Sequence, residues 1–349
     1  AEPAQNYLDV AAYITLFPQL VAGPIVRYGH LAPQLRDRTH SISRFSEGAW
    51  RFMIGFAKKV LIADTAASLA DAGFGLAAPH TGDAWLALAA YAVQIFFDFS
   101  GYSDMAVGLG LMIGFRFPEN FDRPYTSRSI TEFWRRWHMS LSRWLRDYLY
   151  IPLGGNRRGA RRTYVNLLTV MVIGGLWHGA AWTFVLWGAW HGMWLIIERL
   201  VGVRAVEARG ASGGSAGGPR PDSRDQAFQK TLRAVAGNLY AMAIVLAGWV
   251  LFRSPDLAGA ATLATGLVGA HGAGVSAAMA WQLDSLAIVA LVAGIALVYG
   301  GPVIGRAFSR PATGMPALRT REVAVSLLFL VGVVKLVAES YSPFLYFQF

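Results

Sequence analysis

Two histidines stand inside one of the most apolar stretches of this chain, GGLWHGAAWTFVLWGAWHG, residues 174–192. His178 and His191 each occupy a Trp-His-Gly triplet. An ionisable side chain in a segment suited to lipid or protein interior is costly without a partner, so it is a functional-site candidate by default. The alternative is a structural histidine bonded to a neighbouring helix. At about 100° per residue the two imidazoles fall on different helical faces, so we favour His178 for chemistry and a supporting or interfacial role for His191.

A third histidine lies in RSITEFWRRWHMSLSRWLRDYLYIPLGG, residues 128–155. Its tryptophans alternate with arginines, a pattern typical of an amphipathic helix at a membrane interface, with Ser129 or Thr131 able to cap its start. One interpretation is an interfacial anchor whose arginines reach lipid phosphates. In the other, His138 points inward beside His178.

Two acids, Asp98 and Asp104, lie within the apolar run QIFFDFSGYSDMAVGLGLMIG. A metal pair would need a larger ligand set than this spacing provides. We therefore expect these carboxylates to pair with a buried arginine or with backbone, and no bound metal. Because the zinc-helix, phosphate-loop and nucleophile-elbow motifs are missing from the sequence, general acid and base chemistry by histidine remains.

The composition identifies a membrane protein, because 54% of the 349 residues are hydrophobic and only 15% are charged. The net charge of +10 comes mainly from short connections between apolar runs, which follows the positive-inside bias and argues against nucleic-acid binding. The chain has no cysteine. It opens without Met or a signal-peptide pattern, from which we expect an N-terminally truncated sequence.

Seven spans are expected, at 10–26, 48–70, 84–115, 163–199, 232–252, 284–305 and 323–338. Residues 1–200 form a motif-rich core, 201–231 a flexible cytosolic linker rich in Gly and Ser, and 232–349 C-terminal helices with an aromatic tail. Basic loops at 154–162 and 306–321 predict cytosolic positions for both, whereas the loop 253–283 is expected outside. Residues 163–199 must then cross twice, with a break around Gly174–Ala181 next to His178.

Several long motifs in order resemble the bacterial branch of the membrane-bound O-acyltransferase (MBOAT) family, towards its alginate O-acetyltransferase membrane subunits. They are YITLFPQLVAGPIVRY, QIFFDFSGYSDMAVGLGLMIGFRFPENF, YTSRSITEFWRRWHMSLSRWLRDYLYIPLGGN, GGLWHGAAWTFVLWGAWHG and PFLYFQF. The resemblance implies an all-α polytopic bundle in the bacterial inner membrane, with re-entrant or broken helices around a transmembrane tunnel. Relatives carry further helices upstream.

The resemblance also implies an activity and its residues. His178 matches the family's catalytic histidine and His138 its second functional histidine, with supporting positions at Trp177, Trp137, Arg135, Arg136, Asp98 and Asp104. A cytosolic thioester, acetyl-CoA in an acetylating member, would donate an acyl group for O-acetylation of an exported polysaccharide such as alginate. No bound cofactor is implied.

The aromatic tail adds a hypothesis. Counting crossings places Tyr346 outside, where it would either relay the acyl group to a periplasmic acetyltransferase-like partner or serve as an interfacial anchor among membrane lipids. Two other functions stay open on the sequence alone: a transporter subunit and a non-catalytic scaffold of a polysaccharide secretion complex. The sequence does not indicate which polymer is acylated.

Overall fold

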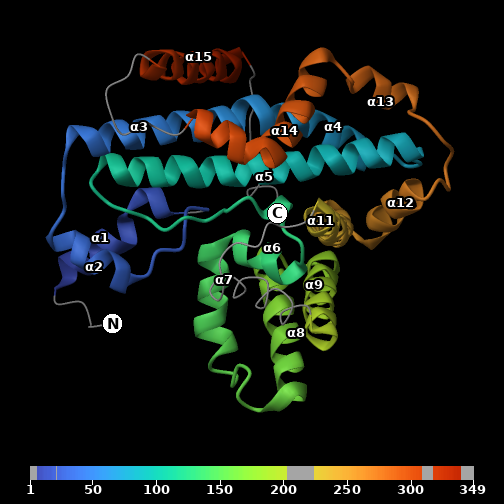
Figure 1. The fold of residues 1–349 in the computed structure, drawn as a ribbon, viewed down its shortest axis with the longest axis horizontal. Helices are drawn as coiled ribbons and strands as arrows, with labels where there is room; N and C mark the ends of the chain where they lie inside the picture. The colour runs from blue at the N-terminus through green and yellow to red at the C-terminus, as the bar shows by residue number, and fades with distance from the viewer. Residues whose placement is uncertain (1–5, 21, 203–223, 309–316, 339–349) are drawn as a thin grey trace. The chain divides into compact units, whose positions relative to one another are not determined.

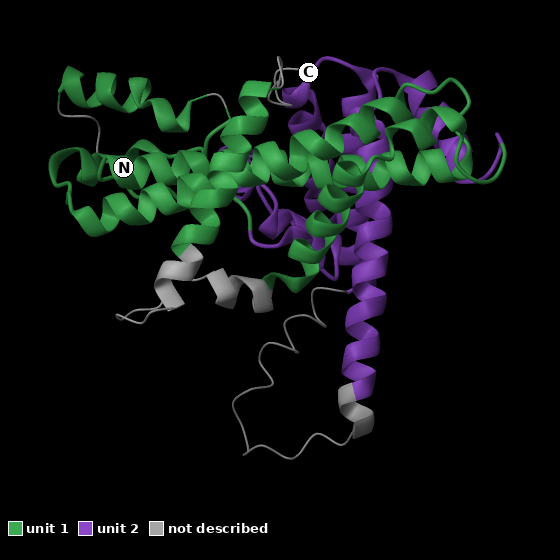
Figure 2. Cartoon of the chain, turned by 90° about the horizontal axis from the view of Figure 1, so that it is seen from above, with its two compact units in different colours: residues 1–121, 272–349 green, residues 122–271 purple. Residues whose placement is uncertain are grey.

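The computed structural model of this chain describes residues 6–20, 22–202, 224–308 and 317–338. Throughout these residues every regular element is a helix, which confirms the expected all-α class (Figure 1). The chain forms two compact units, one made of residues 1–121 with 272–349 and the other of residues 122–271 (Figure 2). Most of the expected linker, residues 203–223, and the tail with Tyr346 lie outside the described residues.

The first unit is built around one long helix, α5 (Thr81–Met112), most of whose side chains are buried. Helices α3 (Ile42–Ala57) and α4 (Asp64–Phe74) join through a π-helical turn, η2 (Lys58–Ala63), and pack along α5 (Figure 1). The other helices of this unit are α1 (Tyr7–Thr15), α2 (Tyr28–Arg36), α13 (Ala277–Gln282), α14 (Ser285–Phe308) and α15 (Ala317–Ala338).

Glycines let α3 and α5 approach until their backbones touch. A Cβ atom added to Gly55 would lie 2.5 Å from the carbonyl oxygen of Gly101, and one added to Gly101 would lie 2.7 Å from that of Gly55. Gly48 of α3 and Gly108 of α5 form the same reciprocal contact further along these two helices. Small residues at such spacing permit close packing in membranes, where dispersion replaces the hydrophobic drive between helices.

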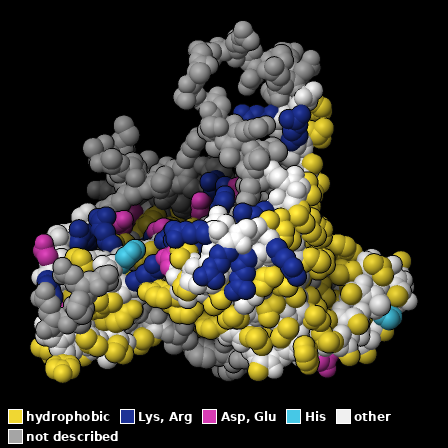
Figure 3. All heavy atoms as spheres, turned by 90° about the horizontal axis from the view of Figure 1, so that it is seen from below, with side chains coloured by type: hydrophobic (Ala, Val, Ile, Leu, Met, Phe, Trp, Pro, Cys, Tyr) yellow, Lys and Arg dark blue, Asp and Glu magenta, His cyan; other side chains and the backbone are white. Residues whose placement is uncertain are grey.

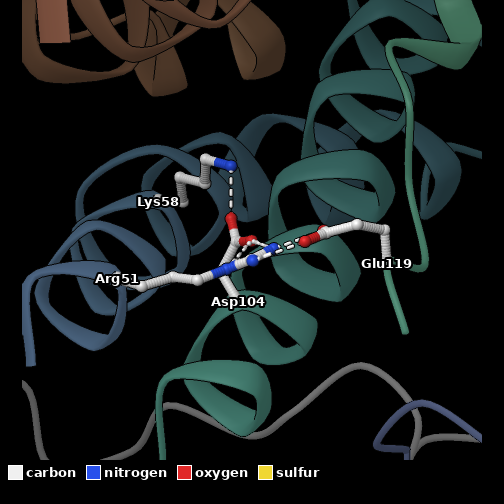
Figure 4. Close-up of polar contacts among 4 residues, drawn as sticks. All are labelled: Arg51, Lys58, Asp104 and Glu119. Carbon is white, nitrogen blue, oxygen red and sulfur yellow. Dashed lines mark hydrogen bonds and ion pairs between the residues drawn. The ribbon is translucent and has the colours of Figure 1, made fainter. Parts of the chain in front are cut away.

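Two acids of α5, Asp104 and Asp98, are held by cations of the preceding helices; the expected arginine is present at Asp104, whereas Asp98 pairs with a lysine. Asp104 accepts hydrogen bonds from Arg51 at 2.9 Å and Lys58 at 2.6 Å, and Arg51 also binds Glu119 (Figure 4). Asp98, 2% exposed, pairs with Lys59 at 2.9 Å. The π-helical turn widens the helix at Lys58 and Lys59, and these consecutive side chains reach two different acids of one partner helix.

Two details of the sequence prediction were wrong. The span at 10–26 is not one helix, because α1 ends at Thr15 and a 3₁₀ turn with Pro18 follows; proline lacks the N–H that a continuing helix needs. The expected loop 253–283 contains α12 (Leu257–Leu267) and α13. Asp256 and Ser276 cap these helices by accepting the backbone N–H of Gly259 and Met279.

Two described helices are long and apolar enough to cross a membrane, Thr81–Met112 and Phe228–Arg253. Leu257–Leu267 and Ser285–Gly301 are shorter apolar helices. The space-filling view shows Lys and Arg side chains gathered on the face in sight, flanked by broad hydrophobic areas (Figure 3).

The second unit contains both histidines that are candidates for catalysis, His138 and His178. Its helices are α6 (Ile130–Arg136), α7 (Met139–Leu145), α8 (Gly159–His178), α9 (Trp182–Val201), α11 (Arg224–Arg253) and α12, with a π-helical turn η4 (Arg146–Tyr150) after α7. Helices α8 and α9 form a tight hairpin in which a Cβ on Gly188 would lie 2.3 Å from the carbonyl oxygen of Met171. This hairpin supplies one wall of the site.

Candidate active site

His178 lies where the hairpin turns, which confirms the expected break. It is the last residue of α8, Gly179 and Ala181 are extended, and α9 begins at Trp182. A Cβ atom on Gly179 would lie 2.6 Å from a ring carbon of Phe184, so a larger residue would push the turn away from α9. His178 is therefore the residue at which α8 ends, next to the turn that leads into α9.

His138 lies at a second break. The amphipathic stretch is not one continuous helix, because His138 adopts a left-handed conformation with φ 43° and ψ 54° between α6 and α7. Such a conformation is uncommon in a non-glycine residue and is maintained only where surrounding contacts fix it. Here the backbone N–H of Ser142 donates to the His138 carbonyl at 3.0 Å, and the Ser142 hydroxyl donates to the Trp134 carbonyl at 3.0 Å. The turn buries the imidazole, leaving it 4% exposed.

Aromatic rings surround both imidazoles. The His178 ring centroid lies 5.3 Å from Trp187, 4.9 Å from Phe252 and 4.9 Å from Trp177, and Trp177 lies 6.2 Å from His138. Trp177 itself is half-exposed. The two histidines thus share an aromatic neighbour and a surrounding of low polarity, which strengthens any hydrogen bond made between them and a substrate.

One cavity of about 320 Å³ brings the histidines together. Its wall includes His138 and His178 with Trp134, Trp137 and Trp187, and it is otherwise mainly apolar. Arg135, Arg146, Asn156 and Arg199 supply further polar side chains. The hypothesis that His138 points inward beside His178 therefore agrees with the structure, although the two reach the cavity from different helix breaks.

Electrostatics keep His138 neutral. Burial, with the neighbouring His178 adding to it, lowers the pKa of His138 to about 3. A neutral imidazole donates from one ring nitrogen and accepts at the other. His138 is therefore suited to orient or polarise a carbonyl group rather than to carry a positive charge.

The remaining predicted residues separate into two groups. Trp137, 4% exposed, and Arg135 line the cavity. Arg136 instead pairs with Glu132 at 2.6 Å and donates to the Thr126 hydroxyl at 3.2 Å, which stabilises α6. Asp98 and Asp104 belong to the first unit and are engaged by Lys59, Lys58 and Arg51. Among the described residues no three His, Asp or Glu side chains are grouped as metal ligands.

Glu198 is an important residue that the sequence interpretation did not select. Its carboxylate is 1% exposed and accepts the backbone N–H groups of Ile130 at 2.5 Å and Thr131 at 2.8 Å, while Tyr240 donates to it at 3.3 Å. It thereby fixes the start of α6, the helix that leads to His138. The sequence signal that could have identified Glu198 is an acidic residue at the end of an apolar helix.

His191 lies next to the cavity in an aromatic box. It is fully buried against Phe133, Trp134 and Trp187, and neither ring nitrogen has a hydrogen-bond partner in the part of the chain that the structure describes. A Cβ atom on Gly248 would lie 2.6 Å from its Nε2 atom. His191 therefore belongs to the aromatic packing beside the cavity, and its role stays a prediction.

The family assignment follows from comparison with known proteins. Residues 4–205 match the model described as MBOAT, membrane-bound O-acyltransferase family. Because this match covers more than half of the chain, the chain belongs to that family. It is a membrane protein and an O-acyltransferase, so the resemblance seen in the motifs is confirmed.

Particular relatives extend the similarity over nearly the whole chain. The "Probable alginate O-acetylase AlgI" of Azotobacter vinelandii is 47% identical over 99% of this chain and 70% of its own length, and that of Pseudomonas aeruginosa is 44% identical over 99% and 71%. The peptidoglycan O-acetyltransferase of Helicobacter pylori is 39% identical over 76% of this chain and 48% of its own length.

Proposed function

We propose that this chain is a multi-pass protein of the bacterial inner membrane that passes an acetyl group from a cytosolic thioester through a transmembrane tunnel, for O-acetylation of an exported polysaccharide such as alginate. The observation that carries the proposal is the meeting of His138 and His178 in one cavity of a chain that belongs to the MBOAT family. The names of these relatives support an acetyl group and a glycan acceptor.

His178 acts as the general base in this mechanism. It takes the proton of the acceptor hydroxyl while the hydroxyl oxygen attacks the thioester carbonyl carbon, and neutral His138 donates a hydrogen bond to the carbonyl oxygen as negative charge develops there. The carbon–sulfur bond then breaks. The leaving thiolate takes the proton from His178, which restores the neutral base and completes the ester.

We further propose acetyl-CoA as the donor, with a carrier-protein thioester as the alternative. The acceptor facing the tunnel is either the polymer or Tyr346, which would hand the acetyl group to a periplasmic acetyltransferase-like partner. Replacing Tyr346 by Phe would then abolish polymer acetylation, whereas full acetylation of the Tyr346→Phe strain would exclude the relay.

The acetyl content of the exported polysaccharide tests the activity. Cells carrying His178→Ala should export polymer without acetyl esters at unchanged abundance of the membrane protein. The matched control is His30→Ala, because His30 is an exposed histidine outside the cavity. Loss of polymer export itself would favour a transporter or scaffold, and normal acetylation would show that His178 is structural.

A further inference from the structure

One surface of the second unit, outside the cavity, is strongly basic. It consists of the end of the turn between η4 and α8 and the first residues of α8, here called the basic turn (residues 157–162). Four exposed arginines occupy it: Arg157, Arg158, Arg161 and Arg162. None of them lines the cavity of His138 and His178. The proposed acyl transfer therefore leaves the basic turn without a role.

The charge of the basic turn is not balanced by the acids around it. The nearest acids along the chain are Asp147, which pairs with Arg146 at 2.6 Å, and Glu198, which accepts hydrogen bonds from α6 and Tyr240. None of the four guanidinium groups has an ion pair or a hydrogen bond within the described part of the chain. Four exposed charges of one sign at one place attract an anionic partner.

The turn that holds these arginines has a fixed structure. The side-chain amide of Asn166, which is buried, donates to the carbonyl oxygens of Leu153 at 3.3 Å and Gly155 at 2.9 Å. Gly154 and Gly155 adopt φ values of 105° and 53°, which glycine permits and which reverse the chain ahead of α8. A preorganised surface of this kind loses little conformational entropy when it binds.

Exposed apolar side chains border the basic turn on both sides. On α8, Val165 and Leu168 follow Arg161 by four and seven residues, so they lie on the same helical face, and both are exposed. Before the turn, the exposed rings of Trp144 and Tyr148 have centroids 5.2 Å apart. Because η4 packs beside α8 and the turn joins the two, both apolar groups adjoin the same arginines (Figure 1).

The order of these side chains along α8 matches the layers of a phospholipid leaflet. From Arg161 to Leu168 the helix rises about 10 Å at 1.5 Å per residue. In a leaflet, phosphates lie above the hydrocarbon region within a headgroup layer about 5 to 8 Å thick. Exposed tryptophan and tyrosine are typical of the boundary between these layers. A soluble polyanion would neutralise the arginines but leave the apolar side chains in water.

We propose that the basic turn and its apolar borders form a binding surface for anionic phospholipids. The four guanidinium groups contact lipid phosphates, whose oxygens match their planar set of donors, and the apolar side chains lie against the acyl chains. Lipids with a net negative charge are preferred, because a zwitterionic headgroup brings a cation of its own next to the arginines. The surface thereby holds η4 and the start of α8 at the membrane boundary.

A local test is possible because the chain has no cysteine, so one introduced cysteine takes a single fluorescent label. The full chain with Ile151→Cys, at an exposed position beside the turn, is labelled and placed in lipid nanodiscs. These contain brominated phosphatidylglycerol or brominated phosphatidylcholine at one mole fraction in unbrominated phosphatidylcholine, and bromine quenches the label on contact. Phosphatidylglycerol should show an association constant about fivefold higher, the factor typical of one basic residue at an anionic surface.

Substitutions then assign this preference to the arginines. Replacing all four by Gln should abolish it at an unchanged melting temperature, and replacing all four by Lys should retain most of it, because the charge is kept. Arg233→Gln removes an exposed arginine of α11 outside this surface and should leave the preference as it is. A label at Val292→Cys, on an exposed apolar face of α14, should be quenched equally by both lipids.

Three results would overturn the proposal. The first is equal quenching of the Ile151→Cys label by both lipids, and the second is a preference that survives replacement of the four arginines by Gln. The third is a label that shows no lipid preference but responds to an added acidic carrier protein, which would assign the surface to a protein partner. If the four-glutamine protein does not fold, salt replaces it: the preference should weaken between about 0.1 M and 1 M salt, where the screening length falls from about 10 Å to about 3 Å, and a preference independent of salt would also overturn the proposal.

Discussion

We predict that removing the Glu198 carboxylate lowers both the stability and the activity of the protein. Glu198 accepts the N–H groups of Ile130 and Thr131, which are 68 and 67 positions away in the sequence, and it is almost fully buried. These N–H groups open α6, and α6 ends immediately before Trp137 and His138. Glu198→Ala therefore leaves buried donors without partners and releases the helix that positions His138.

The magnitude follows from the two lost bonds. A hydrogen bond to a charged group contributes about 1.5 to 3 kcal/mol, so two give about 3 to 6 kcal/mol before relaxation of α6 reduces the loss. Glu198→Gln should also destabilise the protein, because its amide NH₂ would face a backbone donor. Tyr240→Phe removes only the 3.3 Å contact and should have the smallest effect.

Two assays check this prediction. The melting temperature of detergent-purified protein should fall in the order Tyr240→Phe, Glu198→Gln, Glu198→Ala, and acetyl transfer by folded Glu198→Ala protein should fall with it because His138 is displaced. Glu47→Ala, at an exposed acid of α3, is the control. A Glu198→Ala protein with wild-type melting temperature and activity would refute the argument.

Four further predictions concern packing and charge. Gly101→Ala should reduce the free energy of unfolding by about 1 to 3 kcal/mol and so lower the melting temperature, because the new Cβ atom would meet the Gly55 carbonyl. An unchanged melting curve would contradict the close contact. Asp98→Asn should cost about 1.5 to 3 kcal/mol in stability, followed as a lower melting temperature, because Lys59 loses one of its two acidic partners and keeps the other, Asp64. Gly248→Ala should displace His191, because the new Cβ atom would meet its Nε2 atom. Both the melting temperature and the acetyl-transfer activity should fall, and both can be measured. Because the pKa of His138 is about 3, the pH profile of acetyl transfer should show no ionisation of His138 between about pH 5 and 8. An inflection in that range that is present in wild-type protein and lost in His138→Gln would contradict this.

The sequence by itself determined the class of protein and selected His138 and His178 from the seven histidines of the chain as candidates for the chemistry. Apolar periodicity, short basic connections and the Trp-His-Gly motif are local patterns, which can be recognised in the sequence before the fold is known. The break at His178 was predictable for the same reason, because glycine lowers helix stability where it occurs and Gly179 follows His178 directly. The pairing of Asp98 and Asp104 with cations followed from the cost of burying an unpaired charge.

The tertiary structure decided which groups meet. Periodicity predicted one amphipathic helix over residues 128–155, but contacts of Ser142 and Trp134 hold His138 in a left-handed turn that no helical pattern encodes. The role of Glu198 depends on partners from a distant part of the chain. Arg135, Arg146 and Arg199 line the cavity only because the tertiary fold brings them there. The chemistry of a single side chain can be recognised in the sequence, whereas its partners and its access to a cavity depend on long-range packing.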